Sequence, residues 1–248
     1  MSKLKTIEEI KDLEIAGKIV EKVFIAVQEK LKAGITSLEL DKLAYDIIIK
    51  NKATPLFLNH QGFPNTICAS PNNVVVHGIP NNKKLVEGDI ITIDVGAKYN
   101  KMCVDAARTF AVGNISKKDQ ELISLTDEAL NLAIAEIKPN KTIGDIANVI
   151  ETFFNKHKKY SISEQYVGHF IGEKLWEEPI FPNKGIRGTG LRLQKGMTFC
   201  IEPVIIVGKD QLFVDPFDDW TVYTKHNGKA CHIEHTILVT EKGAKIII

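Results

Sequence analysis

Residues 85–105 read LVEGDIITIDVGAKYNKMCVD, two apolar runs separated by Tyr99-Asn100-Lys101. β-Branched residues on both sides of a turn signal predict an antiparallel hairpin. If the turn is centred between residues 99 and 100, Asp94 lies directly opposite Asp105, with Cβ atoms about 5 Å apart. Carboxylates this close repel each other unless a cation lies between them, and the spacing suits two metal ions about 3.5–4 Å apart. The segment therefore predicts a β-sheet with a metal site on one face.

Part of this segment recurs 108 residues further along the chain. Leu85–Asp94 and Leu193–Glu202 both read Leu-x-x-Gly-x-x-x-x-Ile-acid. Each copy follows two segments of helical spacing that open on a capping residue. No Pro/Gly/Ser-rich linker lies between them. We therefore predict one α+β domain of two pseudo-symmetric halves, about 1–115 and 116–248, around a shared antiparallel sheet.

The expected helices run from Thr6 to Gly34, Thr36 to Pro55, Ser116 to Pro139 and Thr142 to Phe153. The strands expected in the first half are 66–69, 74–76, 90–95 and 104–112. Those expected in the second half are 198–207, 212–214, 220–224 and 232–240.

Composition narrows the functional class. The chain has 248 residues, a formal net charge of +1, 44% hydrophobic and 25% charged residues, as expected of an ordinary globular protein. Near-zero charge without basic runs argues against nucleic-acid or membrane-surface binding. The N-terminus does not resemble a signal peptide, and no apolar run reaches the ~20 residues of a membrane span. Four dispersed cysteines then indicate reduced, buried thiols, and we expect a cytoplasmic protein.

Acidic residues occur where strands usually lack them. Asp94, Glu202 and Glu234 lie in apolar runs, and each alone is most simply a strand-end acid facing solvent. Their equivalent positions favour a shared site, although the 32-residue spacing from Glu202 to Glu234 requires more chain between them. His169, between two glycines, is the best-placed imidazole to complete it; a hydrogen-bonded structural histidine is the simpler alternative. His77 ends an apolar strand and can face a substrate.

These residues belong to a pattern that resembles the type I methionine aminopeptidases, which have the pita-bread fold. The resemblance extends from Thr6 to the C-terminus. Its motifs are Val-His-Gly-Ile-Pro at 76–80, Gly-Asp-Ile-x-x-Ile-Asp-Val-Gly-Ala at 88–97, Gly-His-x-Ile-Gly at 168–172, Glu-Glu-Pro at 177–179, Pro-Asn-Lys-Gly at 182–185, Gly-Met-x-x-x-Ile-Glu-Pro at 196–203 and Glu-His-Thr-Ile at 234–237. The absence of a long insertion between His169 and Glu202 disfavours the type II enzymes.

The resemblance implies a dinuclear metal site. Its five ligands would be Asp94, Asp105, His169, Glu202 and Glu234, with Asp105 and Glu234 bridging two divalent ions. An oxygen-rich set with one imidazole suits Mn, Fe(II) or Co without choosing among them. Glu202 would also transfer a proton, and His77 would contact the scissile amide nitrogen. The implied pocket for the methionine side chain comprises Phe57, His60, Phe63, Cys68, Leu175 and Trp220; core packing is the simpler interpretation of Trp220 alone.

The resemblance also implies the substrate and its setting. The family removes the initiator methionine of nascent polypeptides when the next residue is small. We therefore expect transient proximity to the ribosome, no nucleic-acid specificity, no membrane association and a monomer.

Four positions near the expected chemistry depart from the family pattern. Trp176 replaces a usual histidine that holds the substrate, and an indole N–H can donate one hydrogen bond but cannot accept one. Phe170 replaces a glycine after His169, Cys103-Val104 replaces His-Gly or His-Ala before Asp105, and His60 replaces a tyrosine.

Two hypotheses follow from these departures. The chain is a working methionine aminopeptidase with a retuned substrate contact, or a pita-bread homologue with weakened or lost activity that binds a metal or a peptide terminus. Retention of all five ligands and His77 favours the first. A proline-directed aminopeptidase or dipeptidase is a third reading, disfavoured because those relatives usually carry an additional N-terminal domain.

Overall fold

The computed structural model describes residues 3–248. It contains two pairs of helices, α1 (Ile7–Lys30) with α2 (Ser37–Lys50) and α3 (Lys117–Glu136) with α4 (Ile143–Phe154). Each begins directly after its predicted capping residue, whose side chain accepts a hydrogen bond from a backbone N–H of the first turn. The predicted ends of α1, α2 and α3 are later than those observed by a few residues, and that of α4 is one residue earlier: α1 ends at Lys30 rather than near Gly34.

Fifteen short or medium strands accompany the helices in residues 3–248. Those of the first half are β1 (Thr54–Pro55), β2 (Ile67–Pro71), β3 (Val74–Val76), β4 (Ile90–Tyr99) and β5 (Met102–Ala111). Those of the second half are β6 (Tyr160–Ile162), β7 (Gly168–Phe170), β8 (Glu177–Phe181), β9 (Thr198–Ile201), β10 (Val204–Val207), β11 (Leu212–Val214), β12 (Val222–Thr224), β13 (Ala230–His232), β14 (His235–Val239) and β15 (Ala244–Ile246). A single 3-10 turn, η1 (His60–Gly62), follows β1.

Two of the predicted strands are wrong in extent. The run 198–207 is broken into β9 and β10, which belong to different sheets, and 232–240 is broken into β13 and β14. Pro203 lacks the N–H that a continuous ladder needs, so the first break follows from the chain itself. The breaks leave Glu202 and Glu234 between strands, where their side chains need not follow the strict alternation of a sheet.

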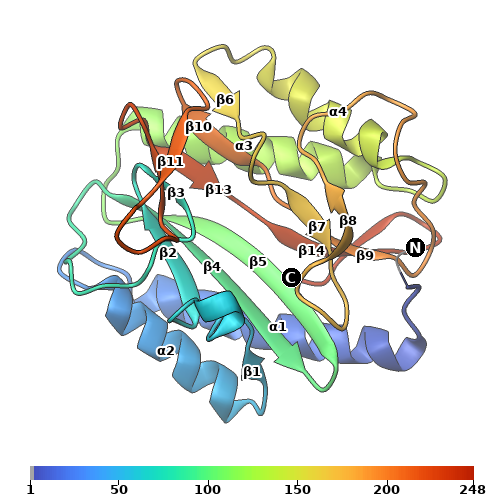
Figure 1. Ribbon diagram of the computed structural model, residues 1–248, viewed down its shortest axis with the longest axis horizontal. Coiled ribbons are helices and arrows are strands. Elements are labelled where there is room, and N and C mark those ends of the chain that lie inside the picture. The colour runs from blue at the N-terminus through green and yellow to red at the C-terminus, as the bar shows by residue number, and fades with distance from the viewer. Residues whose placement is uncertain (1–2) are drawn as a thin grey trace.

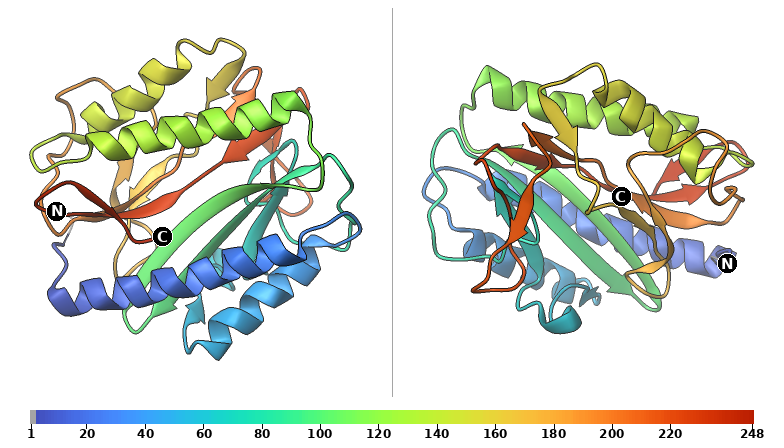
Figure 2. Two further views of the ribbon diagram at one scale, coloured as in Figure 1. Left: turned by 180° about the vertical axis from the view of Figure 1, so that it is seen from behind. Right: turned by 45° about the horizontal axis from the view of Figure 1, so that its top comes forward.

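The sheets lie between the two helix pairs and the open side of the molecule. Viewed from behind, α1 and α3 cross the strands on the near side, with α2 and α4 beyond them (Figure 2, left). In Figure 1 the long β4–β5 hairpin lies above α1 and α2, and β7, β8, β9 and β14 of the second half lie below α3 and α4. All strand pairs among the described residues are antiparallel, as predicted.

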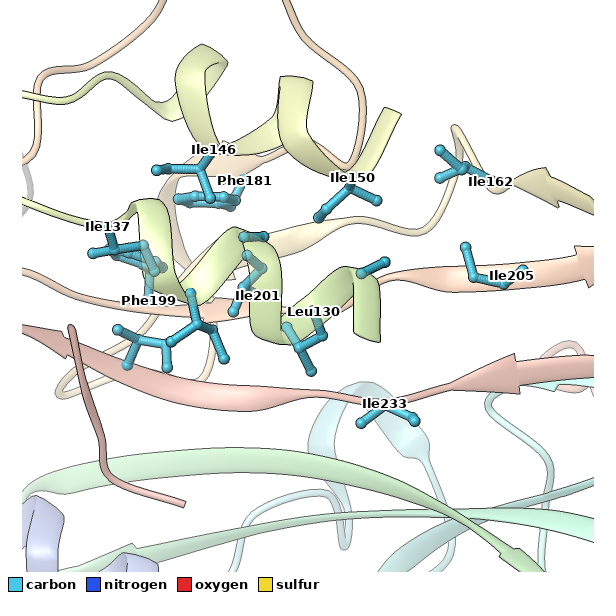
Figure 3. Packing of buried hydrophobic residues seen from close by; sticks show 14 of the residues in the cluster. Leu130, Ile137, Ile146, Ile150, Ile162, Phe181, Phe199, Ile201, Ile205 and Ile233 are labelled. Atoms are coloured by element: carbon cyan, nitrogen blue, oxygen red, sulfur yellow. The ribbon is translucent and has the colours of Figure 1, made fainter. Parts of the chain in front are cut away.

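Strand alternation decides which face carries function. In β4, Ile91, Ile93 and Val95 point toward α1 and form one apolar core with it, so Asp94 faces the other way. The second half repeats this arrangement: Phe199 and Ile201 of β9 pack beneath α3 and α4 in a second core (Figure 3). The polar side chains of both halves are thereby directed to the face that no helix covers.

The two repeated segments adopt the same local structure. Gly88 and Gly196 have φ of +91° and +90°, in the left-handed region that favours glycine, directly before β4 and β9. Leu85 and Leu193 are both buried. This correspondence supports two halves built alike.

The halves meet at backbone contacts beside the polar face. Ala107 of β5 pairs with Glu234 in an isolated antiparallel bridge, with the Glu234 N–H donating to the Ala107 carbonyl at 2.9 Å. β3 of the first half pairs with β12 of the second. Within residues 3–248, no helix is long and apolar enough to cross a membrane.

Candidate metal centre

The β4–β5 hairpin carries two aspartates on its uncovered face. The predicted register is wrong by two: Asp94 pairs with Ala107 and Asp105 with Gly96, so the aspartates are diagonal neighbours rather than directly opposite. The turn lies one residue later than predicted, with Asn100 at φ +49°. A register shift of two residues keeps both side chains on one face of the sheet. One oxygen of each carboxylate therefore still lies within 4.8 Å of the other.

The second half contributes two glutamates to the same place. Glu202 follows β9, and Asn183 Nδ2 donates to its backbone carbonyl at 2.9 Å. Glu234 precedes β14 and is held by its bridge to Ala107. One carboxylate oxygen each from Asp94, Asp105 and Glu234 lies within 4.8 Å of the others. The halves therefore bring together all four predicted acids.

His169 lies in β7 against this cluster. Its Nδ1 is 3.1 Å from the Phe170 carbonyl, which leaves Nε2 directed at the carboxylates. Nε2 is 3.8 Å from Asp105 Oδ2 and 3.9 Å from Glu202 Oε1. A Cβ on Gly168 would overlap the Cys200 carbonyl, so this glycine allows β7 to approach β9 closely. The structure therefore places the His169 ring beside Asp105 and Glu202.

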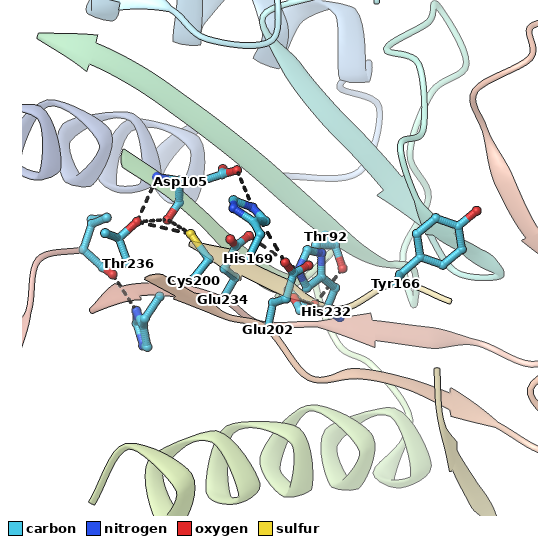
Figure 4. A network of polar contacts seen from close by, with 12 residues as sticks. Thr92, Asp105, Tyr166, His169, Cys200, Glu202, His232, Glu234 and Thr236 are labelled. Atoms are coloured by element: carbon cyan, nitrogen blue, oxygen red, sulfur yellow. Dashed lines mark hydrogen bonds and ion pairs between the residues drawn. The ribbon is translucent and has the colours of Figure 1, made fainter. Parts of the chain in front are cut away.

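Sequence reasoning missed a second imidazole at the cluster, His232. It is the last residue of β13 and 2% exposed. Its Nε2 is 3.3 Å from Glu202 Oε2 and 3.6 Å from Glu234 Oε2 (Figure 4). The signal available was its spacing of two from Glu234, which places both on one face of an extended segment.

The cluster is electrostatically unbalanced. Burial raises the pKa of Asp105 and of Glu202 to about 7, and burial with neighbouring carboxylates raises the pKa values of Asp94 and Glu234 well above their usual range. Burial lowers the pKa of His232 to about 4 and lowers the pKa of His169, so both rings are neutral. No Lys or Arg in residues 3–248 forms an ion pair with these acids.

Unpaired atoms show what the cluster can hold. Asp94 Oδ1, Asp105 Oδ1, Glu234 Oε1 and His232 Nε2 are buried without a hydrogen-bond partner. Buried polar atoms normally have a hydrogen-bond partner, so several unpaired atoms within one cluster indicate that a partner is missing there. Carboxylates and neutral imidazole are ligands for divalent transition metals. The residues present therefore fit a divalent metal centre.

An apolar cavity of about 180 Å³ opens onto the cluster. Phe63 lies edge-on to Trp220, with ring centroids 5.2 Å apart. All the side chains predicted for the pocket line this cavity: Phe57, His60, Phe63, Cys68, Leu175 and Trp220. Gln165, Tyr166 and Val167 also line it and were not predicted. A carboxylate–imidazole cluster that fits divalent metal, beside an apolar cavity, suits hydrolysis of a bond next to one apolar side chain.

His77 projects into the cavity from a strained position. Its φ is +57°, and a Cβ on the following Gly78 would overlap the Ala69 carbonyl. The ring lies edge-on to Tyr166 at 5.5 Å and Trp220 at 6.1 Å. Burial lowers the pKa of His77 to about 4, so the ring is neutral and can donate from one nitrogen.

Two of the departing residues form the mouth of the cavity. The rings of His60 and Trp176 meet edge-on at 4.9 Å, and Trp176 is 44% exposed. His60 Nε2 is buried without a partner. The other departures point elsewhere: Phe170 packs on Phe199 in the second core, and Val104 is buried in the first. Only the His60–Trp176 pair therefore alters the surface that a ligand meets.

Comparison with known proteins places this site in context. The sequence matches a model of metallopeptidase family M24 over residues 11–241. It is 40% identical to the methionine aminopeptidase of Mycoplasma capricolum subsp. capricolum, covering 100% of this chain and 98% of that protein. Methionine aminopeptidase 1 of Bacillus subtilis is 39% identical, with 98% and 97% covered.

Solved structures give the same picture. The crystal structure of methionine aminopeptidase from Rickettsia prowazekii superposes with a TM-score of 0.97 at 36% identity, covering 100% of this chain and 99% of that chain. A prolidase from Pyrococcus furiosus shares the fold alone, with a TM-score of 0.79 at 24% identity; the match covers 64% of that chain.

Proposed function

The chain belongs to metallopeptidase family M24, and from this membership we propose its reaction. It hydrolyses the peptide bond after an N-terminal methionine when the next residue is small. The observation that carries this is a carboxylate–imidazole cluster that lines an apolar cavity, in a chain 40% identical over its full length to a methionine aminopeptidase. The pita-bread fold and the family resemblance expected from the sequence are confirmed.

We propose that the cluster holds two divalent ions, Mn, Fe(II) or Co. Asp94, Asp105, His169, Glu202 and Glu234 would hold them. The nearness of Asp94, Asp105 and Glu234 and the orphaned oxygens support this assignment. Bound there, such ions supply Lewis-acid polarisation of the scissile carbonyl and make water ionise near neutral pH.

The protein's own groups handle the proton and the substrate. Glu202, buried at the cluster, would accept the proton of the attacking water and deliver it to the departing amine. His77 would donate a hydrogen bond to the scissile amide from its fixed position in the cavity wall. Phe63, Cys68 and Trp220 would enclose the methionine thioether, a polarisable group that favours aromatic contacts.

Trp176 would replace a histidine contact to the substrate carbonyl by a single indole donor. Loss of one such donor typically costs about 10²–10³ in rate, so turnover can be modest. The alternative of a binding module without peptidase activity is not favoured, because the cluster, His77 and the cavity are all retained.

The expected setting is the cytoplasm. The substrates would be new polypeptide chains, met close to the ribosome by a monomer.

The test is methionine release from Met-Ala-Ser by metal-stripped protein reconstituted separately with Mn, Fe(II) and Co. Release should depend on metal, disappear in Glu202→Ala and persist in Glu128→Ala, a matched change at an exposed site on α3. An Ala-Pro peptide should remain intact. No release with any metal, from folded protein that binds two ions, would overturn the proposed activity.

A further inference from the structure

The buried ring of His232 has no role in the five-ligand assignment. Its Nε2 has no hydrogen-bond partner, although two carboxylate oxygens lie close by, at 3.3 Å on Glu202 and 3.6 Å on Glu234. An unpaired nitrogen in a buried site costs stability comparable to a lost hydrogen bond. The unpaired Nε2 of His232 therefore points to a missing partner beside Glu202 and Glu234.

The separations distinguish a hydrogen bond from a shared ligand. An N–H···O hydrogen bond from imidazole to a carboxylate normally brings nitrogen and oxygen to about 2.7–3.2 Å. Two atoms that each bind one metal at about 2.1 Å, at angles of 90–109°, lie about 3.0–3.4 Å apart. The pair with Glu202 falls in the second range, and the pair with Glu234 lies just beyond it.

Hydrogen bonds hold the backbone of His232 in place. Thr109 Oγ1 donates to the His232 carbonyl at 2.9 Å, and the His232 N–H reaches the same hydroxyl at 3.3 Å. His232 also pairs with Val204, two residues after Glu202, so β10 and β13 hold the histidine and the glutamate side by side (Figure 4). The Cα of His232 is thus held beside the chain that carries Glu202.

We propose that His232 is a sixth ligand of the metal centre, binding through Nε2 the ion shared with Glu202 and Glu234. His232, Glu202 and Glu234 each offer an atom within 4.8 Å of the others, and Glu234 also belongs to the group with Asp94 and Asp105. The inference rests on the proposed metal site. A second imidazole shifts the preference of that ion position from Mg and Ca toward the transition metals.

The test is nuclear magnetic resonance of protein labelled with ¹⁵N-histidine and loaded with two equivalents of ¹¹³Cd²⁺, a spectroscopic stand-in for the native ion. Scalar coupling between ¹¹³Cd and ¹⁵N reports a direct bond and needs no enzymatic turnover. Two imidazoles should show coupling, those of His169 and His232. His232→Gln should remove one coupled signal and leave that of His169.

His235→Gln is the matched control. That ring is three residues further along, contacts the Ile248 carbonyl at 2.9 Å and does not line the cavity, so both couplings should persist. Calorimetric titration with Mn²⁺ should show at least a tenfold weaker dissociation constant for one ion in His232→Gln.

The outcomes separate the two proposals. Coupling at His169 without coupling at His232 would overturn the sixth ligand, whatever the activity. Methionine release with one coupled imidazole would leave the proposed function standing alone. Two coupled imidazoles without methionine release would establish the ligand and refute the function.

Discussion

Removal of bound divalent metal should lower the melting temperature at neutral pH, because it leaves four crowded, buried carboxylates without a partner. A ligand present at 100 times its dissociation constant stabilises the folded state by about 2.7 kcal/mol. A chain of this size shifts by about 2–4 °C per kcal/mol. Chelation should therefore lower the melting temperature by about 5–10 °C for each ion lost.

The effect should depend on pH in a defined direction. Burial raises the pKa values of Asp105 and Glu202 to about 7, from ordinary values of 3.8 and 4.5. Between about pH 4.5 and 7 the folded, metal-free protein thus binds more protons than the unfolded chain, and its stability falls as pH rises. The slope is about 1.4 kcal/mol per pH unit for each extra proton. Metal binding requires deprotonated ligands, so the stabilisation of the folded state by metal increases as pH rises.

The assay is calorimetric melting at pH 5, 6 and 7, with and without Mn²⁺, after metal removal verified by elemental analysis. The metal-free protein should melt at least about 5 °C lower at pH 7 than at pH 5. Glu202→Gln should reduce that slope, and Glu128→Gln, on the exposed surface of α3, should not. A metal-free melting temperature that is constant or rises from pH 5 to 7 would refute the buried carboxylate cluster.

Three further outcomes are expected. Trp176→His should raise kcat for Met-Ala-Ser at least tenfold by restoring a stronger donor, with little change in melting temperature because the indole is half exposed; a fall in kcat would assign the indole its own role. Phe170→Ala should cost about 3–5 kcal/mol in urea unfolding, since the ring is fully buried against Phe199, while calorimetry still finds the same number of bound ions. Gly168→Ala should weaken Mn²⁺ affinity at least tenfold by pushing β7 and His169 away from β9; unchanged affinity would contradict the close approach.

Local signals predicted the helices well. A capping side chain and the residue three positions later interact within one turn, so Thr6, Thr36 and Thr142 mark the starts of α1, α2 and α4 without any knowledge of the fold. Acidic residues inside apolar runs likewise identified Asp94, Glu202 and Glu234, since only a shared partner makes such burial tolerable.

Long-range geometry was not predictable in the same way. The register of β4 and β5 depends on which residues form a two-residue turn, and a shift of one turn position moved every pair by two. The spacing of His232 from Glu234 places both on one face, but its contact with Glu202 spans 30 residues and follows from the pairing of β10 with β13. Tyr166 and Val167 reach the cavity from a segment without a regular pattern.

The bridge between Ala107 and Glu234 has a consequence for how the molecule assembles. One half contributes Asp94 and Asp105, and the other contributes His169, Glu202 and Glu234. Neither half alone therefore contains all five proposed metal ligands. The halves behave as the two subunits of a dimer joined by the short tether at residues 112–116, which keeps their effective concentration in the millimolar range or above. If the chain were cut within residues 112–116, the two fragments would have to associate by diffusion. A metal ion bound by ligands from both fragments would then stabilise a bimolecular complex.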